Sequence, residues 1–167
     1  MATLIRCTQK LLAEIPAGFV DAEATGECWH ANLFLIERRK CVLFTHDATL
    51  YSVFVPGLKK PEFARLDDVF GQRLFTTMRW DEFSQEQIER MLDACRVIRY
   101  TRTNNRSVLG SMNDLRFQIE VTAQMYGGLN HVDLFDLHRR LNRIPMSAIG
   151  GKYSVERFHE YLSRTSE

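Results

Sequence analysis

The amino-acid sequence predicts an α+β fold in which a small antiparallel sheet packs against four or five helices. Strand-like segments gather in the first third of the chain, at residues 3–7, 29–47 and 50–55, and helical patterns follow from residue 61. This separation favours α+β, because a parallel doubly wound sheet would alternate strands with helices. The length of 167 residues and the hydrophobic content of 45% predict a single domain, residues 1–167, with a substantial core.

A β-hairpin near residues 30–47 is the central element of this prediction. Residues 29–36 and 41–47 carry apolar side chains on both faces, and a charged turn is expected at residues 37–40. A strand pair that is apolar on both faces is covered on both faces, so we expect the hairpin inside the sheet. The predicted alignment sets Asn32 opposite Thr45 and His30 opposite Asp47.

The other elements follow from local patterns. Residues 3–7 can form an N-terminal strand that joins the sheet, and residues 50–55 a third strand after the hairpin. Thr8 is expected to cap a short helix, and Ser84 with Gln87 forms a capping-box pattern. After the strands, apolar side chains recur at helical spacing at residues 61–74, 84–98, 107–126, 130–141 and 154–162.

The charge and hydropathy of the chain restrict the classes of partner. The 22 basic residues nearly cancel the 21 acidic ones, so nucleic-acid binding would need a local basic patch. No apolar run approaches the roughly 20 residues that span a bilayer, and the first apolar block is shorter than a secretory signal. We therefore expect a cytoplasmic protein with no membrane partner, and homo-oligomerisation stays open.

The four cysteines do not form a recognisable disulfide or metal framework. They are far apart in the sequence, without a CxxC pair, and are interpreted as reduced thiols. Cys28, His30, Cys41 and His46 have the right atoms for zinc. Cys41 and His46 are five residues apart, however, so a regular strand directs them to opposite faces. The sequence therefore predicts no metal site, and no cofactor.

His30 and Asp47 are the candidate catalytic residues. A carboxylate beside an imidazole fixes the tautomer of the ring and can adjust its pKa for acid–base chemistry. Ser52, Thr45 or a cysteine could supply a nucleophile, but no pattern such as GxSxG indicates one. A satisfied structural contact at the end of the sheet is the alternative interpretation.

A second group of polar residues surrounds the start of the helix expected at residues 107–126. The backbone amides at a helix start can hold an anion, and Arg106 could add a charge-assisted contact. Capping of the same amides by Asn105 or Ser107 is the alternative. With Asn32 from the hairpin, the candidate ligand- or partner-binding residues are Asn32, Asn105, Arg106, Ser107, Asn113 and Asp114.

Four segments of the chain together resemble a family of small uncharacterised bacterial proteins. They are RCTQKLL at residues 6–12, WHANLFLIERRKCVLFTHDATLYSVFVPGLKK at 29–60, NRSVLGSMNDL at 105–115 and LNRIPMSAIG at 141–150. WHANL, RRKC and SVLGSMNDL, in that order, are the most specific motifs. The resemblance implies a domain of unknown function, with some members carried on plasmids or other mobile DNA, and it implies no reaction or ligand.

Three hypotheses follow from these observations. The first is a non-enzymatic cytoplasmic accessory protein that binds a protein or nucleic-acid partner through the polar end of the hairpin and residues 105–114. The second is a small hydrolase or phosphodiester-processing enzyme that uses His30 and Asp47, with Arg106 and Asn113 holding an anionic group. The third is purely structural, with these polar residues engaged in caps and buried networks.

Overall fold

Within the part of the chain that the structure describes, the sheet has five strands and is mixed. The structure, a computed structural model, describes residues 2–23 and 26–164. The strands lie in the order β4-β3-β2-β1-β5, with β1 parallel to both of its neighbours and the other pairs antiparallel. Their bounds are β1 Thr3–Cys7, β2 Cys28–Ile36, β3 Arg39–His46, β4 Ser52–Val55 and β5 Ile98–Arg102. The α+β class is confirmed, whereas the sheet is not purely antiparallel as predicted.

The described residues contain seven α-helices, more than the four or five expected. Two of them, α1 and α2, are only four residues long. The predicted helix at 61–74 is divided in two, and its second part continues to Trp80. The predicted capping box at Ser84 and Gln87 is confirmed. The helices are α1 Gln9–Leu12, α2 Lys60–Phe63, α3 Leu66–Trp80, α4 Gln85–Ala94, α5 Arg106–Met125, α6 Leu134–Leu141 and α7 Ser154–Arg164. None of them has the length and apolar character needed to cross a membrane.

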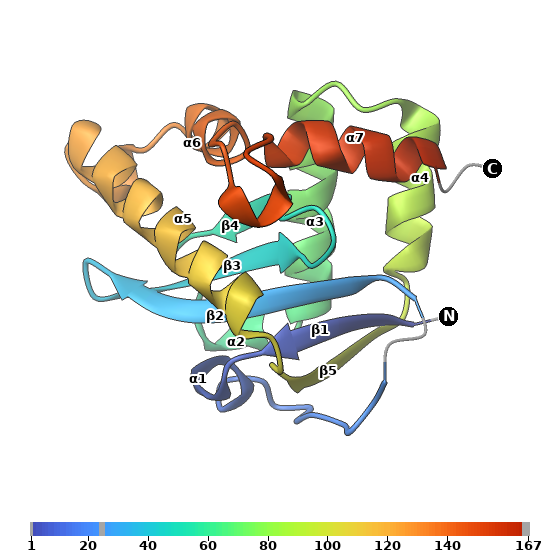
Figure 1. Cartoon of the computed structure of the whole chain (residues 1–167). Helices are drawn as coiled ribbons and strands as arrows, with labels where there is room; N and C mark the ends of the chain where they lie inside the picture. The colour runs from blue at the N-terminus through green and yellow to red at the C-terminus, as the bar shows by residue number, and fades with distance from the viewer. Residues whose placement is uncertain (1, 24–25, 165–167) are drawn as a thin grey trace.

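The helices cover the two faces of the sheet unequally. On one face α5 crosses the hairpin and α6 lies over β4, and their apolar side chains meet Phe34, Leu43 and Phe54 (Figure 1). On the other face the larger core forms around Trp29, Phe44 and residues of the remaining helices. The hairpin strands are thus buried on both faces, as the sequence predicted.

The register of the hairpin differs from the prediction by two residues. The turn contains only Glu37 and Arg38, both with positive φ (52° and 66°), so that Ile36 pairs with Arg39 and His30 with Thr45. Two-residue turns of this hand match the twist of the strands, but they usually carry Asn or Gly, and neither is present here. A hydrogen bond from the Leu129 amide to the Glu37 carboxylate, 2.6 Å long, holds this turn. Because side chains alternate, a shift of two leaves each on its predicted face.

Strand β5 is the element that the sequence analysis missed. Its residues were assigned partly to the helix at 84–98, but α4 ends at Ala94, and Ile98–Arg102 pairs with β1. Ile98 and Tyr100 pack against the larger core. The pairing sends Arg99 and Arg102 to opposite faces of the sheet.

Helix α6 satisfies the backbone of the edge strand β4. His138 Nε2 accepts a hydrogen bond from the Phe54 amide at 2.9 Å. The Asn142 side chain accepts from the Ser52 amide at 2.8 Å and donates to the Ser52 carbonyl at 2.9 Å. These bonds leave less of the edge open to pairing with another chain.

Candidate functional site

His30 and Asp47 are in direct contact at the end of the hairpin. His30 Nδ1 lies 2.7 Å from Asp47 Oδ1, and His30 Nε2 lies 2.8 Å from the Thr103 hydroxyl. The contact is the predicted one, although the register makes it diagonal and not directly cross-strand. A carboxylate can only accept, so Nδ1 carries a proton, and in the neutral ring Nε2 accepts from Thr103. The result is a chain of carboxylate, imidazole and hydroxyl groups.

Arg6 balances the charge of this cluster. Its Nη1 donates to Asp47 Oδ2 at 2.9 Å, and both side chains are 17% exposed, whereas the His30 side chain is fully buried. A carboxylate beside a guanidinium forms a charge-assisted hydrogen bond, which is stronger than a bond between neutral groups. Asp47 is therefore shared between Arg6 and His30, with one bond to each of its two oxygens.

The cluster belongs to a polar row that crosses the whole sheet on one face. His30 is flanked by Thr45 on β3 and Arg6 on β1. The row continues from Thr45 to Ser52 on the edge strand β4, and the hydroxyl groups of these two residues lie 2.8 Å apart. From edge to edge its members are Ser52, Thr45, His30, Arg6 and Thr101. Sequence analysis missed Arg6, Thr101 and Thr103, whose only signal is a polar residue within or just after a strand segment.

Asn32 has a structural partner in the next row. Its side-chain oxygen lies 3.2 Å from the Thr8 hydroxyl, which donates to it. Thr8 was expected to cap the first helix, but its side chain makes no capping bond. The pairing of β1 with β2 has redirected this hydroxyl to Asn32, so Asn32 is half-buried and occupied.

The polar residues at the start of α5 separate into a cap and an exposed face. Asn105 Oδ1 accepts from the amides of Ser107 and Val108, at 3.0 and 3.2 Å. These amides are therefore not free for an anion, and Asn105, not Ser107, is the cap. The exposed candidates, for which no side-chain hydrogen bond or ion pair with another described residue is present, are Arg106, Ser107, Asn113 and Asp114.

The Thr103 contact joins the two groups of predicted residues. Thr103 stands two residues before the α5 cap, and its hydroxyl meets His30 at the polar end of the hairpin. The polar end of the hairpin and the start of α5 therefore form one continuous region.

The family of the chain can be assigned from its sequence. The model of a domain of unknown function, DUF6933, matches residues 4–157, which include every residue of the polar row and all of α5. The chain belongs to this family. No curated protein matches it.

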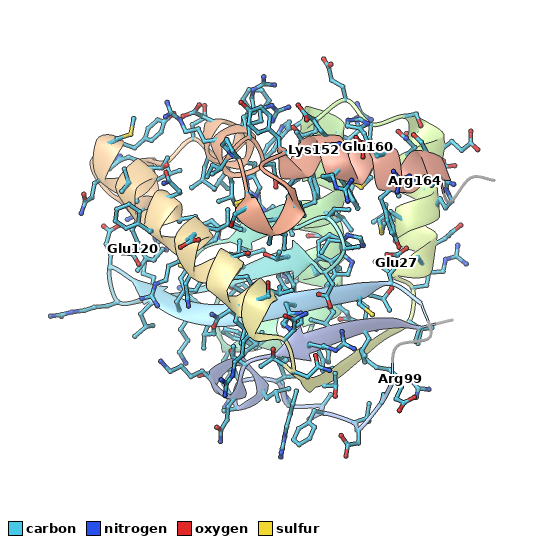
Figure 2. The ribbon with its side chains drawn as sticks, viewed as in Figure 1. Glu27, Arg99, Glu120, Lys152, Glu160 and Arg164 are labelled. Carbon is cyan, nitrogen blue, oxygen red and sulfur yellow. The ribbon has the colours of Figure 1, made fainter. Side chains whose placement is uncertain are left out.

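A second carboxylate–histidine pair lies on the other face of the DUF6933 sheet. His46 Nε2 is 2.8 Å from Glu27, and the Tyr161 hydroxyl donates to the same carboxylate at 2.9 Å. Burial acts to raise the pKa of Glu27, but the bonds from His46 and Tyr161 outweigh it and hold that pKa below its usual value. Glu27 lies between the sheet and α7 in Figure 2. The contacts of His46 are those of a satisfied core residue.

The four zinc-type side chains of the DUF6933 domain do not converge. Cys28, His30 and Cys41 share one face of the sheet, with Cys41 in the core near the hairpin turn, and His46 lies on the opposite face. Among the described residues, His, Cys, Asp and Glu side chains do not form a group of three that could hold a metal ion. Burial is the main cause that raises the pKa of the Cys28 thiol.

His30 can reach its surroundings through its two hydrogen-bond partners, Asp47 and Thr103. His30 is fully buried and both ring nitrogens are bonded, whereas Thr103 is half-buried. Thr103 also lines a cavity of about 550 Å³, together with Cys7, Phe19 and Arg102. A hydroxyl bonded to an oriented imidazole is the arrangement that activates a nucleophile, and it is also a common structural network.

Proposed function

We propose that this DUF6933 protein is a non-enzymatic accessory protein that binds a protein partner through the outer face of α5 and the adjoining polar end of the hairpin. The observation that carries the proposal is the contrast between the two predicted groups. His30 is buried with all its hydrogen-bonding capacity used, whereas Arg106, Asn113 and Asp114 are exposed and lack a bond to other described side chains. Exposed polar groups without internal partners are available for recognition.

The chemistry of the α5 face favours a protein over a nucleic acid. Asn113 lies seven residues after Arg106 and four before Phe117, and Asp114 lies three before Phe117, so these residues share one broad side of the helix. Phe117 is 63% exposed, which is unusual for a large apolar side chain. An apolar anchor among amide groups and charges of both signs is typical of a protein interface, whereas a phosphate backbone would select cations alone.

The cellular setting is part of the same proposal and rests on the motifs. The resemblance carried by WHANL, RRKC and SVLGSMNDL supports a bacterial protein, some of whose relatives are carried on mobile DNA. The reduced-thiol interpretation of the four cysteines supports a cytoplasmic location.

The test compares partner capture by Phe117→Arg with capture by Val97→Arg. Both changes place an arginine at an exposed apolar position, 63% and 55% exposed respectively, but Val97 lies outside α5. We expect a protein captured by the wild type from cells that encode it to be lost with Phe117→Arg and retained with Val97→Arg, at equal melting temperatures. Equal capture by both variants would reject the α5 face. Asn105→Ala is unsuitable here, since removing the helix cap lowers stability.

A hydrolase or phosphodiester-processing enzyme is the second candidate, favoured by the geometry at Thr103. Asp47 would orient His30, which as base would take the proton of Thr103 as nucleophile, and Arg106 with Asn113 would hold an anionic group. A panel of ester and phosphodiester substrates would test this. Turnover that disappears in both Thr103→Val and His30→Gln would support the enzyme, and turnover that survives Thr103→Val would exclude the proposed nucleophile.

A further inference from the structure

A basic cavity lies at the hairpin turn, away from the polar row and the outer face of α5. It has a volume of about 600 Å³, and its walls come from the turn, the segment before α2, and the end of α1. Five of its lining side chains are cations and one is an acid: Arg38, Arg39, Lys40, Lys59, Lys60 and Glu14. The sequence presents these cations as two separate runs, RRK and KK, and only the fold brings them together.

Most of this positive charge is not neutralised within the described part of the chain. Lys40 pairs with Glu14 at 2.6 Å. Arg39 donates to the neutral Asn130 side chain. For Arg38 and Lys60 no side-chain hydrogen bond or ion pair to a described residue is present. The whole chain has a formal charge of only +1. The excess of cations around the cavity is therefore offset by acidic residues elsewhere in the molecule.

The backbone at Arg38 supports a role for its side chain. Arg38 has φ of 66° at the second position of the turn, in the left-handed region that favours glycine. A long charged residue at this position is unfavourable for the turn itself. On the cavity wall the Arg39 guanidinium lies against Gly57, where an added Cβ would come within 3.0 Å of it. Several cations around one cavity, one of them at a strained backbone position, favour a ligand that supplies the opposite charge.

We propose that this cavity binds a small ligand with several adjacent phosphate groups, such as a di- or triphosphate. Arginine forks and lysine ammonium groups are the side chains that recognise phosphate oxygens. The volume lies within the range of roughly 300–1,000 Å³ that small-molecule sites occupy. The described residues that line the cavity include no aromatic side chain on which a base could stack. The near-zero net charge of the chain does not attract an extended polyanion. The site is independent of the proposed protein-binding face.

Titration calorimetry with inorganic tripolyphosphate tests the proposal. We expect saturable one-to-one binding that weakens with added salt, and orthophosphate binding weaker by about tenfold, because it contacts fewer cations. Arg38→Glu and Lys60→Glu should each weaken tripolyphosphate binding by about tenfold or more. Arg99→Glu is the matched control, since Arg99 is exposed and lies on the side of the molecule opposite the hairpin turn (Figure 2). Its affinity should stay close to that of the wild type.

Arg38→Gly separates ligand binding from folding. Glycine removes the cation and also relieves the left-handed backbone, so the melting temperature should rise while the affinity for tripolyphosphate falls by about tenfold. The proposal is overturned if tripolyphosphate does not bind saturably, or if Arg99→Glu weakens binding as much as Arg38→Glu. It is also overturned if a single-stranded oligonucleotide binds more tightly than tripolyphosphate, since the cavity would then belong to a nucleic-acid surface.

Discussion

Acidification should destabilise the protein through His138, which joins α6 to the edge strand. The ring is 1% exposed, and its Nδ1 donates to the Leu134 carbonyl at 2.7 Å. Its Nε2 must stay unprotonated, because it accepts from the Phe54 amide. Burial is the main cause that lowers the pKa of His138 from 6.5 to about 4, and the nearby positive charge of Arg73 lowers it further.

The size of the effect follows from this pKa difference. The folded-state pKa is below the unfolded one, so the unfolded chain binds a proton between pH 6.5 and about 4 that the folded protein does not. The contribution to stability is fully present above pH 6.5 and is lost as pH falls through this window. At about 1.4 kcal/mol per pH unit, the total loss is about 3 kcal/mol.

Urea unfolding of the wild type and His138→Gln, followed from about pH 7 to about pH 4.5, isolates this contribution. The glutamine carbonyl can still accept from the Phe54 amide but does not titrate. Carboxylates affect both proteins equally, so the wild type should lose about 2 kcal/mol more than the variant over this range. Identical pH dependence in the two proteins would refute the assignment of a neutral buried His138.

Three further predictions concern the buried polar groups. Asn142→Ala should lower the free energy of unfolding by about 3 kcal/mol, because the Ser52 amide and carbonyl both lose their side-chain partner; a loss below about 1 kcal/mol in urea unfolding would contradict this. Asp47→Ala should cost about 3 kcal/mol, since the arginine and histidine of the polar row both lose the shared carboxylate; an unchanged melting temperature would show that the pair contributes nothing. With a thiol-specific reagent at neutral pH, Cys28 should react before Cys7, because Cys7 is buried and burial raises its pKa to about 12; equal labelling rates in mass spectra would argue against this order.

The sequence alone determined the local elements and the faces of the hairpin. Side-chain alternation is a property of each strand, so His30 and Asp47 were placed on the same face although the turn was predicted two residues too long. The cap at Ser84 was likewise predicted from chemistry within one helical turn. These features depend on neighbours a few residues away, which the sequence shows directly.

Only the tertiary structure decided the pairing of distant segments. Strand β5 forms by pairing with the free edge of β1, which lies more than 90 residues earlier in the sequence. That pairing places Thr103 beside His30. The turn at Glu37 takes its two-residue form with help from the Leu129 amide. The basic cavity exists because the segment before α2 lies beside this turn. Burial and hydrogen bonding between remote segments select these contacts, and their energies depend on the packed fold and not on local sequence.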